Sequence, residues 1–165
     1  MIKGDIAYFE RSGPDNTDRV LELVKRRSDD LGIDTVVLAS TRGGTAEKAL
    51  EVLKGKNLVI VGIDRDRFPS DILSQAGEEG FHVIFSHETD YDYPEEMKSA
   101  FRRFSQGMKV SVEDVVVACV RNALEEGVDV ISLAGSSWGA DTAIVVNSAS
   151  SFSGVKIREI ICMPR

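Results

Sequence analysis

One junction recurs along the chain and limits what it can fold into: a glycine followed within three residues by an apolar run rich in β-branched residues. It occurs at Gly32, Gly55, Gly80 and Gly127, and the runs that follow read "TVVLA", "LVIVGI", "FHVIF" and "VDVISLA". Glycine ends helices because it adopts the left-handed conformation without strain. Continuous apolar runs are typical of strands that are covered on both faces. The alternation therefore predicts an α/β fold with a mostly parallel sheet.

Further apolar runs lie near the two ends of the chain. A short one spans Ile6–Phe9, and "TAIVVNSA" and "KIREIICMP" follow each other near the C-terminus. The link between the last two, "SSFSG", is short enough for a hairpin. We therefore expect the last strand to be antiparallel, which makes the sheet mixed.

Helices are predicted between these runs. The first begins near Asp15–Thr17 and ends at Gly32 in a Schellman motif, because Ile33 follows the glycine. A second helix begins after Gly44.

The middle of the chain is less regular. A helix is expected from Pro94, with a break at Gly107. The apolar positions of Val112–Glu126 follow the helical period, and Ser111 with Asp114 resembles a capping box at its start.

Composition excludes several classes of function. The chain has 165 residues, which suits one domain spanning 1–165, and its net charge is −7. Such an acidic balance argues against nucleic-acid or anionic-membrane partners. No apolar run is long enough to cross a bilayer and the first residues lack a signal-peptide pattern, so we expect a cytoplasmic protein. Cys119 and Cys162 each lie in an apolar run and are expected to be buried thiols.

The segment "STRGGT" follows one predicted strand and opens a helix. At that position, backbone N–H groups and the helix dipole favour an anion. The glycines permit close approach of the backbone, and the hydroxyls add donors. An equally weighted alternative is a simple helix cap and turn. The candidate phosphate-binding residues here are Ser40, Thr41, Arg42, Gly43, Gly44 and Thr45.

A second loop, "AGSSWGADTA", repeats this chemistry after another predicted strand. Trp138 could stack on a planar or sugar ligand, or cover the core. Asp141 would repel a phosphate, so we expect it to accept backbone N–H groups that brace the loop, or to meet a ligand hydroxyl. The candidate residues here are Gly135, Ser136, Ser137, Trp138, Gly139, Asp141 and Thr142.

Other side chains could complete a site. Lys109 could neutralise a phosphate, as could Arg42, and Gln106 could bind a polar edge of the ligand. The acidic cluster around His87 lacks the ligand spacing of a metal centre, so no metal is expected. No nucleophile motif assigns a catalytic residue.

The two loops resemble those of the pyruvate kinase C-terminal domain, and the chain as a whole is similar to small stand-alone proteins of that domain family. The marks are "YFERSGPDNTDRVLELV", "VVLAST.GGTA", "FRRFSQGMKVSVE", "GSSWGADTA" and "IREIICMPR". The resemblance implies a three-layer α/β/α sandwich with a mixed sheet of about five main strands. It also implies flavin mononucleotide (FMN) as a ligand, without pyruvate kinase activity. The chain departs from the family pattern at Gly62–Phe68 and in His87–Glu96.

We therefore expect a protein that binds a small phosphorylated molecule, FMN or a sugar phosphate, between the two loops. Two alternatives remain open: a flavin-dependent oxidoreductase, and a regulatory module that self-associates as a homo-oligomer without a ligand.

Overall fold

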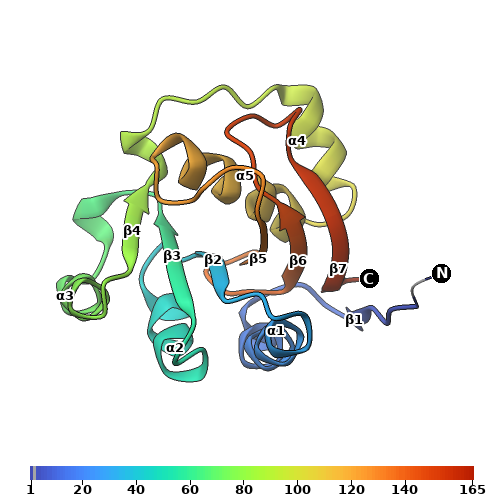
Figure 1. Ribbon diagram of the computed structural model, residues 1–165, viewed down its shortest axis with the longest axis horizontal. Helices are drawn as coiled ribbons and strands as arrows, with labels where there is room; N and C mark the ends of the chain where they lie inside the picture. Colours follow the sequence, from blue (N-terminus) through green and yellow to red (C-terminus); the bar gives the residue numbers. More distant parts are fainter. Residues whose placement is uncertain (2) are drawn as a thin grey trace.

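A computed structural model describes Met1 and residues 3–165 and confirms the α/β class. Its mixed seven-stranded sheet has the order β1-β7-β6-β5-β2-β3-β4 (Figure 1). The strands are β1 (Ala7–Phe9), β2 (Thr35–Ala39), β3 (Asn57–Gly62), β4 (His82–Phe85), β5 (Asp129–Ala134), β6 (Thr142–Asn147) and β7 (Lys156–Pro164). The α-helices within the described residues are α1 (Thr17–Leu31), α2 (Gly44–Val52), α3 (Ser70–Glu78), α4 (Glu95–Arg102) and α5 (Gln106–Val120).

Strand direction follows the predicted mixed pattern. Strands β5, β2, β3 and β4 are parallel, whereas β6 is antiparallel to both of its neighbours, β5 and β7. The predicted hairpin between the last two strands is therefore confirmed. Because the chain reverses twice, β7 again runs with the parallel set, and β1 pairs parallel to it. The short edge strands β1 and β4 bring the total to seven, rather than about five main strands.

Helices cover both faces of the sheet. Helices α1, α2 and α3 lie on one face and α4 and α5 on the other (Figure 1). Alternate side chains of β2 show the division: Val36 and Leu38 join the core beneath α1–α3, and Val37 joins the core beneath α5. The arrangement is compatible with the predicted α/β/α sandwich.

The predicted helix stop at Gly32 is confirmed. Gly32 has φ 65°, and the amide of Ile33 donates to the carbonyl of Ser28 at 3.0 Å, as in a Schellman motif. The stop predicted at Gly127 is wrong for α5, which ends at Val120. There Asn122 takes the left-handed conformation, with φ 54°. Asparagine tolerates this conformation, so the helix ends before the glycine.

The start of α5 differs from the prediction. The helix begins at Gln106 rather than at Val112, and Ser105 caps it by accepting a hydrogen bond from the Met108 amide at 2.8 Å. Gly107 therefore lies in the first turn instead of breaking the helix. A Cβ there would lie 2.3 Å from Thr142 Oγ1, so the glycine permits helix–loop contact.

Ser111 and Asp114 consequently do not form a capping box. Both lie in the interior of α5, and both are buried.

Two further predictions concern the cysteines and the hydropathy of the helices. Cys119 and Cys162 are free and buried, as predicted, and burial raises the pKa of Cys119 to about 11 and that of Cys162 to about 12. Among Met1 and residues 3–165, no helix has the length and apolar character needed to span a bilayer.

Candidate functional site

The two glycine-containing loops lie side by side. Strands β2 and β5 are neighbours in the sheet, with Leu38 in register with Leu133, and one loop leaves the carboxyl end of each strand. The loops line one cleft with a volume of about 440 Å³, together with the carboxyl end of β3 and one face of α5. Such an edge of an open α/β sheet is a common place for a ligand.

The first loop presents free backbone donors. Within the described residues, the amides of residues 41–45 make no hydrogen bond, whereas the next amide, that of Ala46, donates to Ser40 Oγ at 3.1 Å. Thr41 and Thr45 line the cleft. These groups stand at the N-terminus of α2, where partial positive charge accumulates.

Gly43 serves packing between two helices, whereas a Cβ at Gly44 would meet nothing within 4 Å. Gly43 has φ 83°, and a Cβ there would lie 2.6 Å from Ile72 Cδ1 and 2.8 Å from Pro69. Because Gly43 has no Cβ, α2 can lie close to the start of α3. Neither Gly43 nor Gly44 lines the cleft, and Ser40 is a buried cap.

The second loop is braced by Asp141, as predicted. This buried carboxylate accepts hydrogen bonds from the Gly13 amide, the Ser136 hydroxyl and the Thr142 hydroxyl, each at 2.9 Å. The neighbouring Thr142 is likewise buried and does not line the cleft, whereas Gly135, Ser136, Ser137 and Gly139 do.

Trp138 does not cover the core, so that interpretation is wrong. Its side chain is 65% exposed at the cleft, and its φ is 69°, a rare backbone conformation for a bulky residue. The Arg42 guanidinium lies 4.2 Å from its ring centroid. Arg42 therefore joins the two loops through a cation–π contact and is not itself part of the cleft lining.

Helix α5 supplies a polar wall. Gln106 and Lys109, both predicted, line the cleft together with Glu113 and Asp114, which the sequence did not reveal. This spacing places the four side chains on one helix face. Lys109 forms an ion pair with Glu113, whose other oxygen accepts a hydrogen bond from Tyr91 at 2.7 Å.

Asp114 is a buried carboxyl in the lining of the cleft. Only 5% of the residue is exposed, and its Oδ2 has no hydrogen-bond partner in the described chain. Burial raises the pKa of this carboxyl well above its usual range; Glu113 adds to the effect, and Lys109 opposes it. In the sequence, Asp114 is a polar residue in an apolar helical stretch, a pattern that also fits the capping box predicted there.

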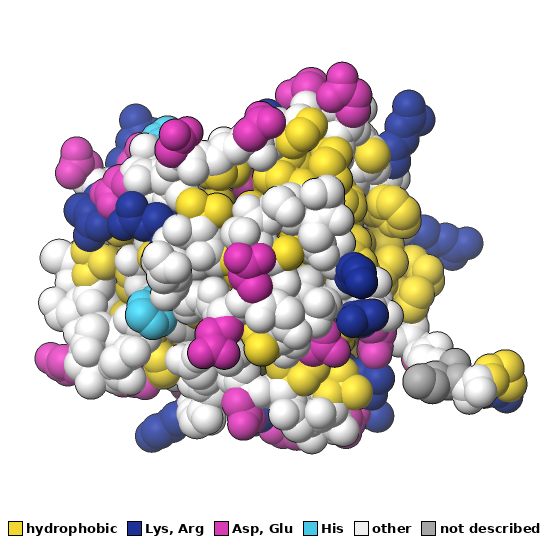
Figure 2. All heavy atoms as spheres, turned by 45° about the horizontal axis from the view of Figure 1, so that its top comes forward, with side chains coloured by type: hydrophobic (Ala, Val, Ile, Leu, Met, Phe, Trp, Pro, Cys, Tyr) yellow, Lys and Arg dark blue, Asp and Glu magenta, His cyan; other side chains and the backbone are white. Residues whose placement is uncertain are grey.

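The cleft is not lined by many basic side chains. Lys109 is its one Lys or Arg side chain among the described residues. On the face of the molecule that Figure 2 shows, acidic and basic side chains are interspersed, with no continuous basic patch. An anion in the cleft would therefore depend mainly on backbone N–H groups.

The segments Gly62–Phe68 and His87–Glu96 meet at the rim of the cleft. Arg65 donates two hydrogen bonds of 2.8 Å to Glu88, and His87 contacts Asp64. Arg65 holds the pKa of the Glu88 carboxyl below its usual value. Within the described chain, no three His, Cys, Asp or Glu side chains are grouped to hold a metal ion.

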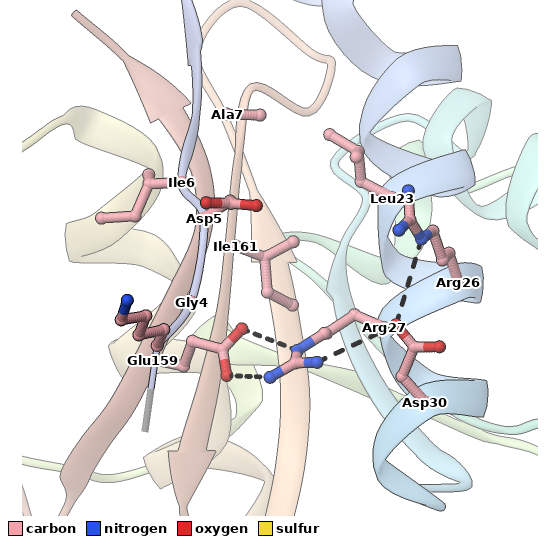
Figure 3. A pocket seen from close by; sticks show the side chains of 11 residues that line it. Gly4, Asp5, Ile6, Ala7, Leu23, Arg26, Arg27, Asp30, Glu159 and Ile161 are labelled. Carbon is pink, nitrogen blue, oxygen red and sulfur yellow. Dashed lines mark hydrogen bonds and ion pairs between the residues drawn. The ribbon is translucent and has the colours of Figure 1, made fainter. Parts of the chain in front are cut away.

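A second cavity, of about 390 Å³, lies between α1, β7 and the segment before β1 (Figure 3). The Arg27 and Glu159 side chains reach across it and form two hydrogen bonds of 2.7 Å. Arg27 also lies 3.9 Å from Asp30. The charged side chains at the centre of this cavity are therefore already paired with one another.

No protein-family model matches the chain.

Proposed function

We propose that the cleft binds a small phosphorylated metabolite, with its phosphate on the backbone N–H groups of residues 41–45 and on the second loop. The observation that carries the proposal is the run of amides without internal partners at the N-terminus of α2, two of which belong to Thr41 and Thr45, residues that line the same cleft as Lys109. Unpaired N–H groups at a helix N-terminus bind phosphate by hydrogen bonding and through the helix dipole. Lys109 would then be shared between the phosphate and Glu113.

The cleft has features that suit FMN or a sugar phosphate. Its volume of about 440 Å³ falls in the usual range of small-molecule sites. Trp138 offers an aromatic surface, and Tyr91, Glu113 and Asp114 offer polar groups for hydroxyls. When bound, FMN would supply redox chemistry, and this chain would hold its phosphate and orient its hydroxylated chain.

The resemblance to the pyruvate kinase C-terminal domain leads to the same proposal, without kinase activity. A cytoplasmic location is part of it, because such metabolites are cytosolic. A flavin-dependent oxidoreductase and a ligand-free self-associating module remain the alternatives. Protein purified without added flavin would be yellow if FMN is retained, and reductants would bleach the colour if the flavin is accessible.

Isothermal titration calorimetry with inorganic phosphate, ribose 5-phosphate and FMN tests the proposal. We expect saturable binding of at least one phosphorylated compound. We also expect Lys109→Met to weaken it about tenfold, because a charge-assisted hydrogen bond is lost and the charge of Glu113 is no longer balanced by a cation beside the anion.

Lys48→Met is the matched control. Lys48 carries the same charge but pairs with Asp18 outside the cleft, at 2.6 Å, so its loss should not change the affinity. The proposal is wrong if millimolar concentrations of all three compounds give no heat, or if both lysine variants weaken binding equally.

A further inference from the structure

The floor of the cleft contains a hydrogen-bond acceptor without a donor. Across Met1 and residues 3–165, the buried side-chain atoms without a partner are Asp114 Oδ2 and Ser111 Oγ. An unsatisfied buried polar group costs about 1–3 kcal/mol, and native proteins pair most of them. Asp114 lines the cleft and Ser111 does not, so only the carboxyl can find its partner there.

Asp114 lies further along α5 than the point where that helix contacts the second loop. The first turn of α5 contacts the second loop, because a Cβ on Gly107 would lie 2.8 Å from Asp141 Oδ1. Asp114 is about two turns further along the same helix face than Gln106, a rise of about 12 Å. A ligand with its phosphate at the loops would therefore present its other end to Asp114.

The groups around Asp114 define the chemistry of that end. Both oxygens of Glu113 already have partners, Tyr91 and Lys109, whereas the Asp114 carboxyl is unsatisfied. A second phosphate there would be repelled by the Glu113 carboxylate, and the buried Asp114 carboxyl offers it no positive charge. A hydroxyl can donate to the carboxyl, as sugar hydroxyls do to acidic side chains in nucleotide sites.

We infer that Asp114 recognises the hydroxyl groups of a polyol monophosphate and disfavours bisphosphates. This inference rests on the proposed function, since the phosphate at the loops sets the orientation. The hydroxyls could belong to a sugar or to the ribityl chain of FMN.

The test compares Asp114→Leu and Asp114→Asn with the wild-type protein by calorimetry. The probes are inorganic phosphate, ribose 5-phosphate, FMN and fructose 1,6-bisphosphate. We expect Asp114→Leu to weaken binding of ribose 5-phosphate or FMN by about 10- to 100-fold, the equivalent of one hydrogen bond to a carboxylate. Binding of inorganic phosphate should change by less than about twofold. The wild type should bind the bisphosphate more weakly than the monophosphates.

Ser111→Ala is the matched control, because it removes the other unpaired polar atom without altering the cleft lining. It should leave all affinities unchanged. Circular dichroism verifies that each variant is folded, and Asp114→Asn, which keeps the side-chain shape, serves if the leucine variant is not.

The outcomes separate this inference from the proposed function. Selective loss of ribose 5-phosphate or FMN binding supports it, and the compound affected identifies the source of the hydroxyls. Equal affinity of wild type and variants for all probes overturns the role of Asp114 but leaves phosphate binding intact. Equal weakening of phosphate and ribose 5-phosphate also overturns it. Failure of the wild type to bind any probe overturns both.

Discussion

The cleft at the carboxyl ends of β2 and β5 and the cavity between α1 and β7 have similar volumes, about 440 and 390 Å³, but differ in how their polar groups are satisfied. In the cavity, Arg27 and Glu159 complete each other through two hydrogen bonds. In the cleft, the amides of Thr41 and Thr45 and the Oδ2 atom of Asp114 have no partner within the described chain. Volume alone would not separate the two places. The buried and unpaired Asp114 Oδ2 does, because a folded chain leaves few buried polar atoms without a partner.

The largest expected effect comes from breaking the cleft at Gly107. Gly107→Ala would place a Cβ 2.3 Å from Thr142 Oγ1 and force α5 away from the second loop. We expect a loss of about 2–3 kcal/mol in the free energy of unfolding, typical of overpacking, and loss of phosphate binding. Chemical denaturation and calorimetry measure the two effects.

Gly77→Ala is the control for Gly107. Gly77 also lies within a helix, α3, but a Cβ there meets nothing within 4 Å. Because alanine favours helix more than glycine does, this variant should gain about 0.5–1 kcal/mol. If both alanine variants have the same stability, the helix–loop contact is not as close as described.

Breaking the cavity should affect stability and leave binding alone. Arg27→Met removes one partner of a pair whose side chains are 28% and 26% exposed, so we expect a loss of about 1–2 kcal/mol. Arg26→Met is the comparison, because that side chain is 82% exposed and its contact with Asp30 is 4.0 Å. It should change stability by less than about 0.5 kcal/mol. A change in phosphate affinity on replacing Arg27 would contradict the division between the two regions.

The smallest expected effect is a gain in stability, whereas most substitutions of buried residues destabilise a protein. Asp114→Leu should raise the free energy of unfolding by about 1 kcal/mol at pH 8, because it removes an unpaired buried carboxyl. Burial raises the pKa of Asp114 in the folded state above its unfolded value, so the folded state binds the proton more tightly. Wild-type stability is therefore lost as the pH rises from about 4 through the folded pKa.

The advantage of the leucine variant should accordingly be smaller at pH 5 than at pH 8. Urea denaturation at the two pH values measures it, with Ser111→Ala as a control that carries no titrating group. An equal advantage at both pH values would show that Asp114 does not titrate differently in the two states.

Local signals predicted the regular elements well and their exact limits less well. The stop at Gly32 was predictable because the Schellman motif involves only neighbouring residues. The start of α5 was not. Gly107 reads as a helix breaker until Thr142, distant in sequence, is placed against it.

The residues of the candidate site also fall into those that the sequence predicted and those that it did not. Thr41, Thr45 and the second loop were identified, since glycine and hydroxyl residues after strands are visible in one dimension. Glu113 and Asp114 were missed, because their polar stripe becomes part of a cleft only when α5 packs on the sheet beside the two loops.

The sequence by itself determined the alternation of helices and strands and the two loops that follow β2 and β5. Those features depend on periodicity and on backbone preferences within a few residues. Only the tertiary structure decided that β2 and β5 are neighbours and that Asp114 is buried without a partner. Strand order and burial are set by contacts between segments far apart in the chain, where one residue's partner depends on how every other element packs.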